Sequence, residues 1–303
     1  MPEGPEVTIL GQYLTTKIKN NILNRITILS GKYLKKEIKG INKVQNKNYK
    51  ILNVDSKGKL MWLELENDTY ITSHLGLSGF WNFDKSDTDR IRLEITNGAT
   101  KEKYLLCYQD PRNFGNIEVL TKNELDKKLL DLADDALKTN FTNKEFEEKI
   151  KKFLSVSKTR GKQIIFKVLM NQKKKDGIVS GLGNYLTPEI LYDCKISPLR
   201  TIESLTTTEI HNLAYSIKYI IKLSYFNNVT GYMTRFYDFI IVHKNGVLNG
   251  IFPDFHPTIK IRKTEKFEFK VYQKKTDPFG NLVEANKELN KGRTTYWVPI
   301  VQK

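Results

Sequence analysis

The chain has 303 residues, a formal net charge of +16 and a sequence pI near 9.5. This length favours about two domains, and the charge favours an acidic polymer or surface as partner, with nucleic acid as the first candidate. No apolar run approaches the roughly 18 residues of a membrane helix, and no charged-then-apolar signal segment opens the chain. We therefore expect an intracellular soluble protein, of the nucleus or cytoplasm, that is not secreted and not a membrane protein.

Cysteine and histidine are scarce. Cys107 and Cys194 lie far apart, which excludes a disulfide framework and a CxxC metal site. The four histidines show no paired ligand spacing, so each is interpreted as structural. They are His74, His211, His243 and His256.

The first residues, Met1-Pro2-Glu3-Gly4-Pro5-Glu6, carry two competing interpretations. Pro and Glu are common in the first turn of a helix, and apolar residues from Val7 to Ile18 recur at helical spacing. If Met1 is removed, however, Pro2 exposes a secondary amine, which is a nucleophile, next to the carboxyl group of Glu3. These residues alone favour the helix start over catalysis.

Residues 22–120 read as short strands rich in β-branched and aromatic residues, separated by turn residues. Such a succession predicts an antiparallel two-sheet β-sandwich or barrel. The expected strands are 26–28, 49–54, 60–65, 70–74, 80–83, 91–95, 104–108 and 117–120.

From residue 121 the pattern becomes helical, and we place the domain connection at 134–142. Residues 227–258 contain Gly, Asn and Pro and are expected to be mostly loop, and segments 267–272 and 294–301 are expected to pair as a hairpin. The expected helices are 124–132, 144–154, 160–172, 184–194 and 205–224.

Three local patterns suit nucleic acid, and each has an ordinary structural alternative. Asn184 follows a Gly-rich loop at a helix start, where N–H groups bind phosphate, or it is merely the helix cap. Lys59 enters a strand from a tight turn and is either a phosphate ligand or solvated. Arg112 and Phe114 lie two apart and, on an extended segment, point the same way, as needed to fill the gap left by an extruded base. An exposed Arg beside a core Phe is the alternative.

Taken together, these stretches resemble the formamidopyrimidine-DNA glycosylase and endonuclease VIII family over nearly the whole chain. The matching motifs are Pro2-Glu3-Gly4-Pro5-Glu6, Lys57-Gly58-Lys59, His74-Leu75-Gly76-Leu77-Ser78-Gly79, Asp110-Pro111-Arg112-Asn113-Phe114-Gly115, Gly181-Leu182-Gly183-Asn184-Tyr185 and Gly292-Arg293-Thr294-Thr295-Tyr296. Because six motifs occur in this order, the catalytic interpretation of Pro2 is now favoured over that of a simple helix start.

The resemblance implies an α+β fold with three parts. Residues 1–135 would form a catalytic domain with an N-terminal helix and a two-sheet sandwich. Residues 136–258 would form a helical domain with a helix–two-turn–helix. Residues 259–303 would form a β-hairpin finger.

The resemblance also implies a bifunctional DNA glycosylase and AP lyase, a monomer that acts on DNA with oxidised bases or abasic sites through an N-terminal proline Schiff base and β,δ-elimination. Pro2 would be the nucleophile on C1′, Glu3 the acid that helps to open the sugar, and Glu6 a supporting group. DNA phosphates would be held by Lys59, Asn184 and Arg293. The residues inserted into the DNA double helix would be Leu77, Arg112 and Phe114.

Residues 260–303 depart from many relatives because they contain neither Cys nor His. Zinc sites need such ligands, so we expect no metal and no organic cofactor, and a finger that resembles the zincless finger of some eukaryotic and viral members. The loop before Gly181 is longer than usual and carries Lys173-Lys174-Lys175-Asp176, interpreted as a solvated turn. The rival functions are a non-catalytic binder of distorted DNA, which retention of Met1 would favour, and a basic protein of membrane surfaces.

Overall fold

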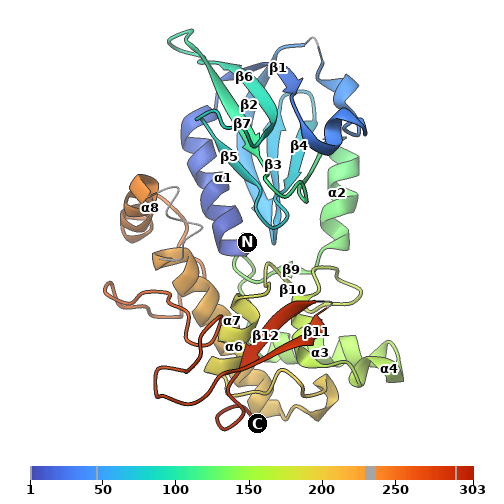
Figure 1. The fold of residues 1–303 in the computed structure, drawn as a ribbon, viewed down its shortest axis with the longest axis vertical. Coiled ribbons are helices and arrows are strands. Elements are labelled where there is room, and N and C mark those ends of the chain that lie inside the picture. The colour runs from blue at the N-terminus through green and yellow to red at the C-terminus, as the bar shows by residue number, and fades with distance from the viewer. Residues whose placement is uncertain (1, 46, 229–236, 291) are drawn as a thin grey trace. The chain divides into compact units, whose positions relative to one another are not determined.

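The computed structural model describes residues 2–45, 47–228, 237–290 and 292–303 (Figure 1). The chain forms two compact units. The first consists of Glu6–Leu130 with Pro2, and the second of Asp131–Lys303 with Glu3–Pro5. The expected subdivision of the second unit at residue 258 stays a prediction.

The chain begins with helix α1, Gly4–Ile18, as the apolar spacing predicts. Val7, Leu10, Leu14 and Ile18 are fully buried, and Thr15 donates its hydroxyl to the backbone oxygens of Gly11 and Val54. Helix α1 therefore packs against the strand that carries Val54 along its apolar face.

The first unit contains eight strands connected in the order β5-β7-β6-β1-β2-β3-β4-β8, with every neighbouring pair antiparallel. Only Ile22–Lys50 and Leu23–Tyr49 join β1 to β2, so two four-stranded halves meet at that narrow junction. The strands are β1 Ile22–Ile28, β2 Tyr49–Lys57, β3 Leu60–Leu65, β4 Thr69–His74, β5 Phe80–Asn82, β6 Asp89–Thr96, β7 Lys103–Gln109 and β8 Asn116–Thr121. Short 3-10 turns η1, Gly31–Leu34, and η2, Ile41–Lys43, precede β2, and helix α2, Lys122–Asp131, follows β8.

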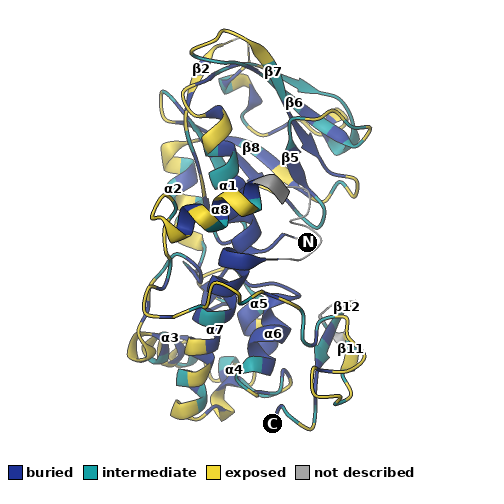
Figure 2. Cartoon of the chain, turned by 90° about the vertical axis from the view of Figure 1, so that its left-hand side faces the viewer, coloured by how far each residue is buried: buried dark blue, intermediate teal, exposed yellow. Residues whose placement is uncertain are grey.

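The second unit is mainly helical. Its long helix α7 is buried over most of its surface, whereas α3 exposes a charged face (Figure 2). The elements are β9 Asp134–Asp135, α3 Asn143–Ser155, α4 Lys158–Gly161, α5 Ile165–Met170, β10 Val179–Ser180, α6 Leu186–Asp193, η3 Ile202–Ser204, α7 Thr207–Asn227 and α8 Tyr237–Leu248. No helix among the described residues is both long and apolar enough to span a membrane.

The single helix expected at 160–172 is wrong, because α4 and α5 are separate. Ile164 is extended and pairs with Thr201, and the Ile165 N–H donates to the Arg200 carbonyl at 2.8 Å. The segment with Arg200 and Thr201 thus forms hydrogen bonds with residues that would bond within the helix if it were continuous.

The loop expected over 227–258 is wrong in part, because residues 237–248 form α8. Its buried His243 packs against the rings of Tyr225, Phe239 and Phe252. The portion 229–236 lies outside the described residues. Tertiary aromatic packing therefore stabilises a helix that the Gly and Asn content disfavoured.

The expected pairing of 267–272 with 294–301 is also wrong. The hairpin consists of β11, Glu284–Asn290, and β12, Arg293–Trp297. Residues 268–272 are irregular, since the N–H groups of 270–272 donate to the side chain of Glu189 instead of to a neighbouring strand.

Candidate active site

Pro2 and Glu6 lie at the start of α1 and belong to the first unit. Both are buried, and Glu6 is fully so. Removal of Met1, on which the amine chemistry depends, concerns a residue outside the described ones. The candidate nucleophile is thus buried, two residues before the first residue of α1.

Glu3 is held by residues more than 180 positions along the chain. Its carboxylate oxygens accept the N–H groups of Tyr185 at 2.9 Å and Leu186 at 3.3 Å, at the N-terminus of α6. The Gly4 N–H also donates to the Gly181 carbonyl at 2.8 Å. Residue 4 must be small, since a Cβ there would meet the Gly181 Cα at 3.1 Å. Glu3 therefore caps α6, whose N-cap residue is Tyr185.

Lys59 lies in the two-residue turn between β2 and β3, where Gly58 has φ +56°. The register places Leu60, the next residue, opposite His74 at the end of β4. His74 is exposed, but partial desolvation, followed by the nearby charges of Lys59, Lys128 and Lys32, lowers its pKa. Its Nδ1 accepts the Gly76 N–H at 3.3 Å, which leaves Nε2 as the donor of a neutral ring.

The three residues expected to enter DNA lie on two adjoining loops. A Cβ on Gly76 would meet the Gly115 nitrogen at 2.7 Å, so the loop with Leu77 contacts the loop with Arg112 and Phe114 backbone to backbone. Phe114 is 61 % exposed, Arg112 is exposed and Leu77 is half-buried. The argument that Arg112 and Phe114 point the same way on an extended segment is wrong.

That argument fails because Asn113 between them has φ +59°. The Asp110 carboxylate ties the two loops together instead, accepting the Ser78 hydroxyl at 2.9 Å and the Gly115 N–H at 2.7 Å. Asp110 is itself 1 % exposed. A buried carboxylate therefore sets the positions of the exposed Phe114 and its neighbours.

Asn184 and Arg293 lie together in the second unit. The Asn184 side-chain amide donates to the Thr294 carbonyl at 3.2 Å, and Arg293 is the exposed first residue of β12. Burial raises the pKa of Tyr272, and the hydrogen bond from Asn184 opposes that change. The side-chain amide of Asn184 thus joins the Gly-rich loop to the hairpin.

The finger segment is held by a carboxylate and by rings. Glu189 on α6 accepts the N–H groups of Lys270, Val271 and Tyr272 at 3.0, 3.0 and 2.8 Å, while burial raises its pKa. Ring contacts with centroids 5.1–6.2 Å apart link Tyr185, Phe267, Phe269, Tyr272 and Tyr296.

Zinc, which the finger of many relatives implies, does not fit the residues of this segment, since positions 260–303 offer neither Cys nor His. In the described part of the chain, no three His, Cys, Asp or Glu side chains lie close enough together to hold a metal ion.

Three family models match the chain in order: the N-terminal, H2TH and C-terminal domains of formamidopyrimidine-DNA glycosylase, over residues 1–117, 132–233 and 257–303. The chain belongs to this family of DNA glycosylases. The family resemblance predicted from the sequence motifs is thereby confirmed, as is the mixed fold with an N-terminal helix, antiparallel sheet, helical domain and hairpin.

Individual relatives are distant but extensive. The formamidopyrimidine-DNA glycosylase of Prochlorococcus marinus is 27 % identical over 329 aligned positions that cover all of both chains. That of a Wolbachia strain from Brugia malayi is 29 % identical over 218, covering 72 % of this chain and 76 % of the relative. The Lactococcus lactis enzyme, solved bound to DNA containing an AP site, has a TM-score of 0.70 at 19 % identity, with 99 % of each chain covered.

Two further residues lie close to candidate site residues without a local sequence signal for it. His74, which the sequence interpretation treats as structural, pairs with Leu60, the residue after Lys59, and only the strand register shows this. Glu189 gave no signal, because its partners lie 81–83 positions along the chain.

Proposed function

We propose that the chain is a bifunctional enzyme of base excision repair, which removes oxidised bases from DNA and then cleaves the strand at the abasic site. Membership of the glycosylase family and the net charge of +16 support this. The observation that carries the proposal is the binding of the Glu3 carboxylate by the N-terminus of α6. It fixes the residue next to Pro2 beside the loop that bears Asn184.

In the first step, the neutral amine of Pro2 attacks C1′ of the damaged nucleotide. The N–C1′ bond forms and the glycosidic bond breaks, its electron pair leaving with the base, which takes up the proton that remains on the Pro2 nitrogen. Because an α-amino group has a pKa near roughly 8, part of the amine must first lose a proton at neutral pH.

Glu3 is the nearest acceptor in sequence for that proton. Two N–H donors and the positive end of α6 favour the ionised form of its carboxyl group, so we infer that Glu3 accepts the amine proton first. It then donates a proton to O4′ as the C1′–O4′ bond opens and the iminium forms. The role of acid predicted for Glu3 thus becomes the second half of a proton relay.

The iminium acts as an electron sink for strand cleavage. Loss of a C2′ proton breaks the C3′–O bond, and loss of a C4′ proton then breaks the C5′–O bond. Lys59, Asn184 and Arg293 would hold the flanking phosphates through these steps. Leu77, Arg112 and Phe114 would fill the gap left in the duplex, and Glu6 would support the buried start of α1.

The test is borohydride reduction during reaction with a duplex that contains an oxidised base, followed by mass mapping of the adduct. We expect one covalent adduct, on Pro2, in protein whose measured mass shows that Met1 is absent. Pro2→Gly should keep some trapping as a primary amine, and Glu3→Gln should lose most base excision. An adduct on a lysine side chain, or none, contradicts the mechanism, and lesion-specific binding without any cleavage would favour the non-catalytic binder.

A further inference from the structure

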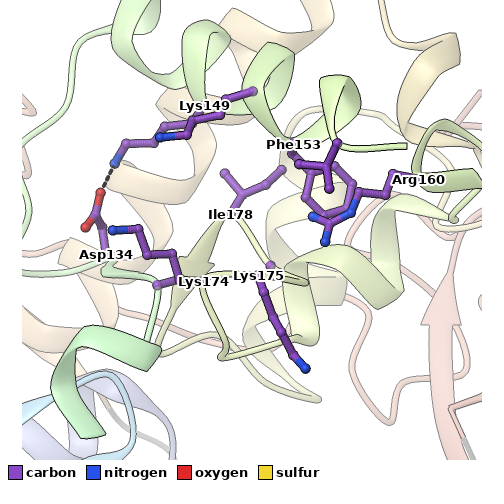
Figure 3. Close-up of a pocket in the computed structure, with 11 residues that line it drawn as sticks. Asp134, Lys149, Phe153, Arg160, Lys174, Lys175 and Ile178 are labelled. Carbon is purple, nitrogen blue, oxygen red and sulfur yellow. Dashed lines mark hydrogen bonds and ion pairs between the residues drawn. The ribbon is translucent and has the colours of Figure 1, made fainter. Parts of the chain in front are cut away.

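A cavity of about 450 Å³ lies in the second unit, and none of the residues assigned to catalysis lines it (Figure 3). Helix α3, the short helix α4, residues 133–134 and the loop 174–178 form its walls. Cavities of this size hold a bulky side chain or a small ligand. The proposed reaction makes no use of it.

The rim of this cavity is positively charged. It carries Lys149, Lys152, Arg160, Lys174 and Lys175, of which the last two belong to the loop before Gly181. Residues 143–176 as a whole contain eleven Lys and Arg against four Asp and Glu. This excess favours an anionic partner.

Part of the rim charge is already compensated. Lys149 is paired with Asp134, and Arg160 lies 3.6 Å from Asp176. Lys152 and Lys174 are exposed, and neither has a carboxylate within 4 Å among the described residues. These two lysines are therefore the cations available to a partner.

The floor of the cavity is apolar and lacks a free aromatic face. Ile178 lies at its centre, and the Phe153 ring is covered by the Arg160 guanidinium, whose carbon lies 4.8 Å from the ring centroid (Figure 3). Val156 at the edge is 62 % exposed. A nucleic-acid base would need a ring on which to stack, whereas an aliphatic or aromatic side chain needs only apolar contact.

We propose that this cavity, with its rim of lysines, docks an acidic peptide segment of a partner protein that inserts one bulky apolar side chain. The apolar side chain would contact Ile178 and Val156, while flanking Asp or Glu residues would pair with Lys152 and Lys174. The loop 173–177 is held by backbone hydrogen bonds from Asp176 and Gly177 to Lys173, so the site is preformed. This function is independent of base excision.

The test uses twelve-residue peptides displayed on phage and selected against the immobilised full chain. We expect enriched sequences with one Leu, Ile, Phe or Trp flanked by three or more acidic residues. A synthetic copy should bind at least tenfold more weakly to the double variant Lys152→Glu/Lys174→Glu, and more weakly to Val156→Asp. The matched control is Lys144→Glu/Lys158→Glu, which makes the same charge change at exposed positions outside the cavity and should alter affinity less than twofold.

Equal loss in both double variants would reduce the interaction to general charge and overturn the proposal, as would the absence of a shared peptide pattern. Affinity for an undamaged duplex is measured in parallel. If the cavity variant weakens duplex binding tenfold more than the control does, while peptide binding is unchanged, the rim contacts DNA instead. Lesion cleavage by the cavity variant should equal that of the control, so failure of the docking site and failure of the enzymatic proposal give different results.

Discussion

Removal of the Glu189 carboxylate is expected to release the segment that carries Tyr272 from α6. Its oxygens accept three consecutive N–H groups, from Lys270 to Tyr272, and its surroundings include the buried Val271. In Glu189→Ala these donors lose their acceptor. Residues 260–303 contain no cysteine or histidine that could hold the segment through a bound metal ion instead.

The magnitude follows from the burial of each donor. An unsatisfied buried N–H costs about 1–3 kcal/mol, a cost that applies in full at Val271, whereas the half-buried Lys270 and Tyr272 can bind water and lose roughly 0.5 kcal/mol each. The burial that raises the pKa of Glu189 also shows that its own desolvation is unfavourable, and this part is regained on removal. We expect a net loss of about 2 kcal/mol, which corresponds to about 4–8 °C in Tm for a unit of this size.

The assay is thermal unfolding followed by circular dichroism, with Kd for lesion-containing duplex measured on the same samples. Glu189→Gln, which keeps one acceptor oxygen, should lie between wild type and Glu189→Ala. Glu268→Ala is the control, because Glu268 is exposed on the same segment. If the Tm of Glu189→Ala stays within 1 °C of this control, the three hydrogen bonds do not anchor the finger and the reasoning is refuted.

Asp110→Asn should slow base excision from duplex DNA about tenfold in single-turnover assays but have little effect on single-stranded substrate. The reason is that the amide cannot accept both the Ser78 and Gly115 donors, which position the residues proposed to fill the gap in the duplex. Equal slowing on both substrates would contradict that role. Arg293→Ala should reduce the slope of log K against log salt by about one, since one phosphate contact is lost, and an unchanged slope would exclude that contact. Burial lowers the pKa of His243 to about 4, so the unfolded state binds more protons and the free energy of unfolding should fall as pH drops from 6.5 towards 4, by about 3 kcal/mol. His243→Phe should remove most of that dependence in urea titrations, and its persistence would assign the effect to another group.

The sequence predicts those parts of the molecule whose signals are local. Helix α1 follows from the spacing of Val7 to Ile18, and the strands follow from runs of β-branched and aromatic residues between turns. The motif that contains Asp110 predicts a functional loop. Its sequence alone does not reveal that Asn113 is left-handed, because φ depends on the carboxylate that fixes both ends of that loop.

The remainder depends on contacts between distant positions. Helix α8 forms around His243 although its Gly and Asn content is unfavourable, because Phe252 and Tyr225 provide a buried aromatic environment. The hairpin pairs 284–290 with β12 because the N–H groups of 270–272 already have an acceptor in Glu189. No hydrophobic periodicity within these segments predicts either outcome.

Helix α6 takes part in long-range contacts of two kinds. It donates hydrogen bonds to one carboxylate and accepts hydrogen bonds through another. At its N-terminus it offers N–H groups to Glu3, which fixes the residue beside the candidate nucleophile. Within the helix, Glu189 accepts N–H groups from the finger, including that of Tyr272, whose hydroxyl hydrogen-bonds with Asn184. Both the proposed proton relay and the hairpin that is proposed to bind phosphate are therefore anchored to one short helix. Because two buried carboxylates set these positions, the geometry of this site should be more sensitive to the loss of a single acceptor on α6 than to a change at the exposed residues of β11.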